Sequence, residues 1–212
     1  MRNLWLSMKI LGLPFALCSL LVMIGIALFV FIMDFFPPSV IVLATEVCLP
    51  LNGAWLGSRI IGADLDNEIL ELSFAQPKFR TKGLIARILA LVVVMIIHVL
   101  AMMLVHRIYD PPCGECYRLL CSTLSPTLFW GGCAFLLTAV LRSPFAAFSV
   151  CMGIWAANLF LAEHLPDQIF LFLAGFEPQS PLFLVNRVLL LSVGICFTLG
   201  GLWLSSKSER FF

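Results

Sequence analysis

The sequence predicts an all-α polytopic membrane protein with six transmembrane helices and both termini in the cytoplasm. It also predicts a short amphipathic cytoplasmic helix between spans 2 and 3, and a re-entrant or interfacial external segment before span 6. Of the 212 residues, 61% are hydrophobic and only 12% are charged, about half the charged fraction of a soluble domain. The apolar residues form continuous runs without the alternation of a transmembrane barrel, so the spanning elements must be helices.

Six apolar runs are long enough to cross a hydrocarbon core, which takes roughly 20 residues. They are Ile10–Met33, Ser39–Gly57, Ile88–Val105, Leu119–Leu141, Ser143–Ala162 and Pro181–Ser206. The first run is longer than the roughly 7–15 residues of a signal peptide's apolar region and has no small-x-small cleavage site, so we expect a span. Residues 1–212 are therefore expected to form a single transmembrane domain.

The basic residues of the loops predict the orientation, because Lys and Arg concentrate on the cytoplasmic side. Three of the 13 fall on one face, at Arg107, Arg118 and Arg187. The other ten fall on the opposite face: Arg2, Lys9, Arg59, Lys78, Arg80, Lys82, Arg87, Arg142, Lys207 and Arg210. This bias puts both termini and the segment 58–87 in the cytoplasm. The net charge of +1 gives no sign of nucleic-acid binding.

The stretch ADLDNEILELSFAQPKFRTKGLIAR, residues 63–87, carries acidic and then basic residues. From Ile60 to Phe74 apolar residues recur at helical spacing, and Pro77 is expected to end this helix before the basic KFRTK. The acidic residues of the row are Asp64, Asp66, Glu68 and Glu71. Basic residues suit lipid phosphates, but an anionic leaflet repels acidic ones. We therefore expect this ridge to bind a soluble cytoplasmic partner rather than lipid.

The external segment EHLPDQIFLFLAGFEPQS encloses a nine-residue apolar run, Gln168 to Phe176. That run is too short to span a bilayer. An interfacial or re-entrant piece and a simple surface hairpin are both consistent with it.

Two stretches resemble the permease subunits of type-2 ABC exporters. The first is NEILELSFAQPKFRTKGLIARILAL, Asn67 to Leu91, where a Glu-rich helix precedes a proline and a basic cluster. The second is PQSPLFLVNRVLLL at the start of the last span, with the tail SSKSERFF that contains the Glu209–Arg210 pair. Six spans with both ends inside agree with this family. The chain differs from larger members because it has no sizeable external domain, which leaves the substrate class open.

The resemblance implies a transport subunit with no catalytic residues or cofactor of its own. The chain contains no G-x-x-x-x-G-K-[ST] phosphate-binding loop, so ATP and Mg²⁺ would be bound by separate cytoplasmic ABC ATPase subunits. These would dock on the acidic helix, here a coupling helix. A second permease chain, identical or paralogous, would complete the pathway within the lipid bilayer. An amphipathic or hydrophobic peptide, drug or lipid-like molecule is the expected cargo.

Glu46 in the second span and Arg187 in the sixth are the formal charges within the six runs. Charged groups in spans normally face protein or water and often pair. We therefore expect a Glu46–Arg187 pair, with a pathway-lining role as the alternative. Asn52, Asn158 and Asn186 fit interhelical hydrogen bonds and a pathway lining equally well.

The external motif CGEC, Cys113 to Cys116, allows three interpretations. They are a structural disulfide or idle thiols, a redox-active pair of an integral-membrane thiol oxidoreductase, and a zinc site with His106 and Cys121. The first is favoured, since no second close cysteine pair is present to relay electrons. His98 and His106 share one span, so they cannot clamp one haem between helices. The redox enzyme is the alternative function, and a membrane scaffold or immunity protein is a third.

Overall fold

The computed structural model describes residues 38–66, 77–109, 116–161 and 181–206, together with Gly25 and His164. The described residues form five α-helices and no strand. The helices are α3 (Pro38–Asp66), α5 (Pro77–Tyr109), α6 (Cys116–Leu141), α7 (Pro144–Phe160) and α9 (Phe183–Ser206). The predicted all-helical class is confirmed for this part of the chain. Apart from the helical Gly25, the first predicted run, Ile10–Met33, lies outside the described residues.

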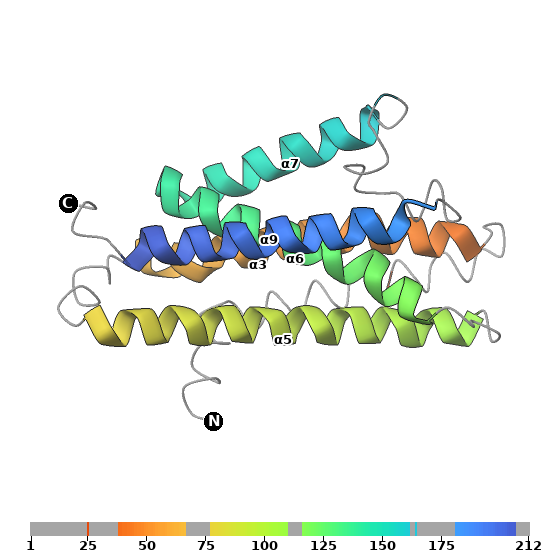
Figure 1. Cartoon of the computed structure of the whole chain (residues 1–212), viewed down its shortest axis with the longest axis horizontal. Coiled ribbons are helices and arrows are strands. Elements are labelled where there is room, and N and C mark those ends of the chain that lie inside the picture. The colour runs from red at the N-terminus through yellow and green to blue at the C-terminus, as the bar shows by residue number, and fades with distance from the viewer. Residues whose placement is uncertain are drawn as a thin grey trace.

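Three of these helices are long and apolar enough to cross a membrane: α5 over Thr81–Ala101, α6 over Thr123–Leu141 and α9 over Phe183–Ser206. The apolar helix α7 is shorter, at 17 residues. Consecutive described helices alternate in direction, so α3 and α9 end, and α5 begins, at the same end of the bundle (Figure 1). The length, composition and arrangement are those of a helical membrane protein.

Helix α6 is the centre of the bundle. It contacts the four other described helices and packs most extensively along α3 and α9, while α5 and α7 lie on opposite sides (Figure 1). The outer faces of α5, α7 and α9 expose large apolar side chains, which suit hydrocarbon rather than water. Those exposed most are Leu89, Leu100, Leu104, Phe145, Phe160, Leu184, Val188, Leu199 and Trp203.

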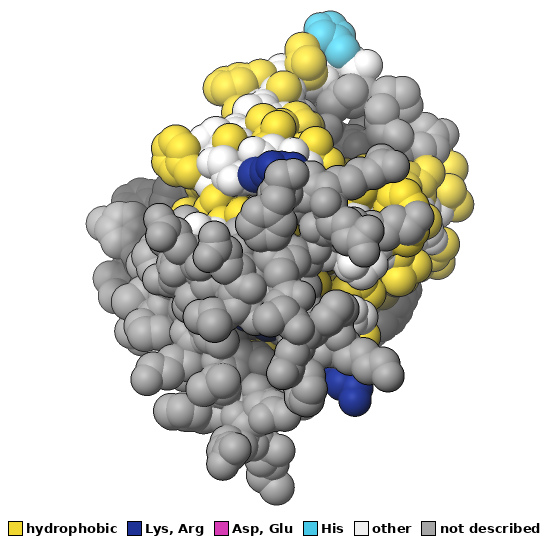
Figure 2. Space-filling model, turned by 90° about the vertical axis from the view of Figure 1, so that its left-hand side faces the viewer, with side chains coloured by type: hydrophobic (Ala, Val, Ile, Leu, Met, Phe, Trp, Pro, Cys, Tyr) yellow, Lys and Arg dark blue, Asp and Glu magenta, His cyan; other side chains and the backbone are white. Residues whose placement is uncertain are grey.

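The described surface can also be viewed from the end of the bundle where α5 begins. In the view onto this end, the described side chains are mostly hydrophobic, and some Lys and Arg side chains appear among them (Figure 2). The placement of the basic residues at one membrane face stays a prediction.

Helices α3 and α6 meet at glycine backbones. A Cβ atom built on Gly57 would lie 2.1 Å from the carbonyl oxygen of Gly131, and one on Gly53 would lie 2.4 Å from that of Thr127. Glycines four residues apart share one helix face and allow close approach of helices in membranes. The face of α3 that carries these glycines thus packs directly against the main chain of α6.

Gly132, which follows Gly131 on α6, makes a similar close contact with α9. A Cβ atom on Gly132 would lie 2.3 Å from the carbonyl oxygen of Gly194. Two consecutive glycines therefore let one helix approach two different neighbours. The central position of α6 depends on this Gly131–Gly132 pair.

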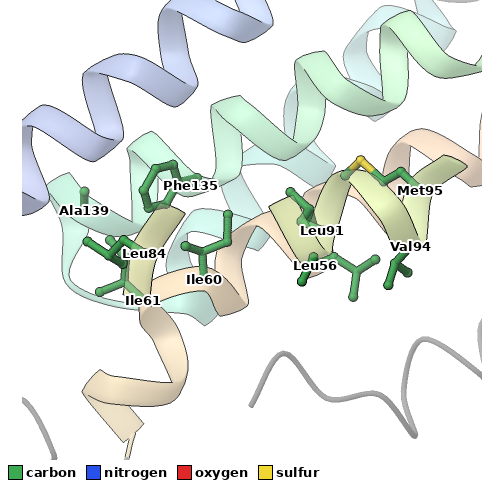
Figure 3. Close-up of a cluster of buried hydrophobic side chains, with 10 residues drawn as sticks. Leu56, Ile60, Ile61, Leu84, Leu91, Val94, Met95, Phe135 and Ala139 are labelled. Atoms are coloured by element: carbon green, nitrogen blue, oxygen red, sulfur yellow. The ribbon is translucent and has the colours of Figure 1, made fainter. Parts of the chain in front are cut away.

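A hydrophobic cluster holds the end of α3 against the start of α5 and the end of α6. Figure 3 shows these side chains converging from the three helices. The buried members are Leu56, Ile60, Ile61, Leu84, Ala90, Leu91, Val94, Met95, Phe135 and Ala139.

The turn between α6 and α7 is short and well capped. Arg142 has a positive φ of 55°, and the Ser143 hydroxyl oxygen accepts a hydrogen bond from the Ala146 N–H at 3.2 Å. Pro144 occupies the first turn of α7, where the missing N–H costs nothing. The chain therefore reverses direction within two residues.

Two boundaries differ from the sequence-based expectation. The residues from Ile60 to Asp66 are the last turns of α3 rather than part of a separate helix. Pro77 is the first residue of α5, so the basic cluster after it belongs to a helix rather than to a loop. Proline is tolerated in the first turn of a helix, so it marks a start as well as a stop. Residues 67–76 lie outside the described part.

Candidate functional site: a buried ion pair between two helices

The predicted Glu46–Arg187 pair is confirmed. Arg187 Nη2 donates a hydrogen bond to Glu46 Oε1, which joins α3 to α9. The side chains of Glu46 and Arg187 are 0% and 2% exposed. Because α3 and α9 both pack mainly along α6, this pair links two helices on either side of the central one.

The surroundings of the pair come from α9 and α3. The Arg187 guanidinium carbon lies 5.1 Å from the ring centroid of Phe183, one turn earlier on α9. This distance is typical of a cation–π contact, which strengthens when water is excluded. Asn186, the neighbouring residue, is fully buried. On α3, Pro50 supplies no N–H to bond the Glu46 carbonyl, so the helix lacks one main-chain hydrogen bond beside the pair.

Helix α7 closes over the same part of α3. The indole Nε1 of Trp155 donates a hydrogen bond to the carbonyl oxygen of Val47 at 3.1 Å. The ring of Phe148 meets that of Trp55 edge-on, at 5.3 Å between centroids. The short helix α7 is therefore attached to α3 by specific side chains at two levels.

The arrangement neutralises two opposite charges within the bundle. A guanidinium and a carboxylate that pair within an apolar bundle cancel each other's charge. Among the described residues, no group of three or more His, Cys, Asp and Glu could hold a metal ion. Five cysteines whose side chains are described are free thiols in helices: Cys48, Cys121, Cys133, Cys151 and Cys196.

The other predicted polar residues are placed as follows. Asn52 on α3 and Asn158 on α7 are both half-buried. His98 on α5 is buried, and its Nδ1 donates to the carbonyl oxygen of Val94 in its own helix at 2.8 Å. Neither the pathway-lining role nor the interhelical role of the asparagines is tested by these positions.

The predicted coupling residues lie at or beyond the end of α3. Asp64 and Asp66 belong to its last turn, while Glu68 and Glu71 lie outside the described residues. Of the external cysteine pair, Cys113 also lies outside, and Cys116 is the first residue of α6. The coupling role and the disulfide stay predictions.

Sequence reasoning missed the glycines of the helix contacts and the Trp155 anchor. The spacing of Gly53 and Gly57 is a small-x-x-x-small signal that could have been read directly. The adjacent Gly131 and Gly132 are a weaker signal, because a glycine pair alone does not say which helix it meets. A tryptophan that bonds a distant carbonyl leaves no trace in the sequence.

In comparisons with known proteins, no family model, no curated protein and no solved structure matches the chain.

Proposed function

We propose that this chain is the membrane-spanning subunit of a type-2 ABC exporter, driven by a separate ATPase. The observation that carries the proposal is the position of the acidic-to-basic stretch. It connects the end of α3, a helix of 29 residues, to the start of α5, a helix of 33 residues. At 1.5 Å per residue these are about 44 and about 50 Å long, against a hydrocarbon core of about 30 Å. Both helices are long enough to extend beyond the core.

This geometry suits a chain whose helices are moved by a cytoplasmic partner. The first turns of α5, from Pro77, carry the basic cluster KFRTK, and the continuous apolar run of this helix begins only at Ile88. The acidic residues Asp64 and Asp66 end α3 on the same side of the bundle. A cytoplasmic ATPase that binds the segment between them would act on two long helices. Closure of the ATPase pair around nucleotide would then move these helices as rigid bodies.

The remaining features of the proposal follow from the six-span arrangement. The alternating directions of the five described helices fit an even number of spans with both termini in the cytoplasm. Two such chains would enclose the pathway. The apolar bundle with its neutralised Glu46–Arg187 pair favours an amphipathic or hydrophobic cargo.

Reversing the charge of Glu68 and Glu71 tests the docking role. The double variant Glu68→Lys, Glu71→Lys should reduce co-purification with the ATPase about tenfold or more, since two attractive contacts become repulsive. Membrane insertion should not change. The measurement is ATPase recovered per amount of tagged chain.

A matched control reverses Glu163 and Glu177, which the predicted topology puts on the opposite membrane face. This control should leave ATPase recovery unchanged. Equal recovery for the parent and the Glu68, Glu71 variant would refute docking on the acidic ridge.

The external cysteines separate export from thiol oxidation. A Cys113→Ser, Cys116→Ser double variant should keep the parent's ATPase association and ATP-dependent activity, because a disulfide there would only join two ends of a turn. Catalytic thiol exchange needs an accessible thiolate and an electron acceptor. Loss of activity in this variant, with quinone-linked thiol oxidation by the parent, would favour the oxidoreductase.

A further inference from the structure

Arg87 connects α5 to the last turns of α3. Its Nη1 donates a hydrogen bond to the main-chain carbonyl oxygen of Ile60 at 2.8 Å, across 27 residues of sequence. A helical carbonyl has a second lone pair, so Ile60 can accept this bond as well as the helical one. Hydrogen bonds from a charged donor are about twice as strong as neutral ones.

The contact lies within a well-packed region. Ile60 and Ile61 of α3 and Leu84 of α5 are 1%, 5% and 2% exposed and belong to one hydrophobic cluster (Figure 3). Arg87 is one turn further along α5 than Leu84 and is half-buried. Its hydrogen bond is therefore shielded in part from competition by water.

The same turns of α3 are held from another side. A Cβ atom on Gly62 would lie 2.7 Å from the Cβ of Pro144 at the start of α7. The end of α3 thus lies between α5 and the α6–α7 turn. Sliding of α3 along α5 would have to break the Arg87 hydrogen bond.

We propose that Arg87 is a positioning residue that makes the end of α3 and the start of α5 move together when the segment 67–76 between them is displaced. This inference rests on the proposed function for the source of the displacement. Without the Arg87 contact, a push on the segment would bend its flanking turns. With the contact, the push reaches the first half of α3, where Glu46 lies.

Hydrogen–deuterium exchange on the full chain in lipid nanodiscs tests the contact itself. Arg87→Gln should accelerate exchange of the amides in residues 60–66 about tenfold, since a hydrogen bond to a charged group is lost. Arg87→Lys keeps the charge and one donor, so its exchange should lie between those of the parent and Arg87→Gln. Lys82→Gln removes an exposed cation from the same helix and should leave exchange unchanged. Exchange at the parent's rate in both Arg87 variants would overturn the proposal.

A second readout separates positioning from a merely structural role. The complex with the co-purified ATPase is trapped with Mg²⁺, ATP and orthovanadate, and exchange is compared with that of the untrapped complex. In the parent, trapping should change exchange both at 67–76 and at residues 46–53 of α3. In Arg87→Gln, the change at 67–76 should persist and the change at 46–53 should be lost. If the change still reaches 46–53, Arg87 is not a positioning residue.

The two proposals fail in different ways. If the parent chain binds no ATPase, the proposed function is wrong, while the exchange of residues 60–66 still decides whether Arg87 holds α3. If the parent binds the ATPase and Arg87→Gln exchanges like the parent, only the Arg87 inference is wrong.

Discussion

Replacing Glu46 with Gln should destabilise the protein by about 3 kcal/mol, because Arg187 then stays buried and charged without its counter-ion. The cost of breaking a buried pair and the cost of a lone arginine in a span both have this magnitude. At about 2–4 °C per kcal/mol, the thermal midpoint should fall by about 6–12 °C. A thiol-reactive dye can report unfolding in detergent through exposure of the fully buried Cys151.

The stabilities of the Glu46 and Arg187 variants should follow a definite order. Arg187→Gln should be milder than Glu46→Gln, because a lone carboxyl can take up a proton and become neutral, whereas a guanidinium cannot lose its charge. The double variant Glu46→Gln, Arg187→Gln leaves no buried charge, so it should be more stable than Glu46→Gln alone. Lys82→Gln, which removes an exposed charge, serves as the control. A double variant no more stable than the worse single one would contradict an energetically coupled pair.

The helices were predictable because apolar runs of spanning length have few other solutions. The predicted runs Ile88–Val105 and Leu119–Leu141 lie wholly within α5 and α6. Those at Ser143–Ala162 and Pro181–Ser206 differ from α7 and α9 by at most two residues at either end. The thickness of the bilayer sets the length of an apolar run, so a spanning helix can be predicted without knowing which helices pack against it.

The ends of α3 and α5 were not predictable in the same way. Charged residues after Gly57 end the apolar run, but they do not end the helix, because Arg and Leu are good helix formers and a single Asp costs less than about 1 kcal/mol. Proline stops a helix in one context and starts one in another, and Pro77 starts α5. The sequence pattern therefore shows which residues suit a membrane better than it shows where a helix begins or ends.

The ion pair and the helix contacts differ in what a sequence reveals. Glu46 and Arg187 are rare charges in apolar runs, and the cost of leaving either alone made their pairing predictable. The Arg87 bond to the Ile60 carbonyl involves a main-chain acceptor, which every residue has, so no pattern singles it out. Likewise, Gly57 shows that α3 is approached closely, but only the fold identifies Gly131 as its partner.

Replacing Gly57 with Ala should destabilise the protein by about 2 kcal/mol, even though alanine is the better helix former. The added Cβ would lie 2.1 Å from the Gly131 carbonyl oxygen and 2.8 Å from its Cα, and neither main-chain atom can move without separating α3 from α6. Such overpacking costs about 1–3 kcal/mol or more, against a helix-propensity gain of about 0.5–1 kcal/mol. Gly153→Ala is the matched control: nothing lies within 4 Å of its Cβ on α7, so only the gain should appear. Equal thermal midpoints for these two variants in the thiol-dye assay would show that the α3–α6 contact is not made through Gly57.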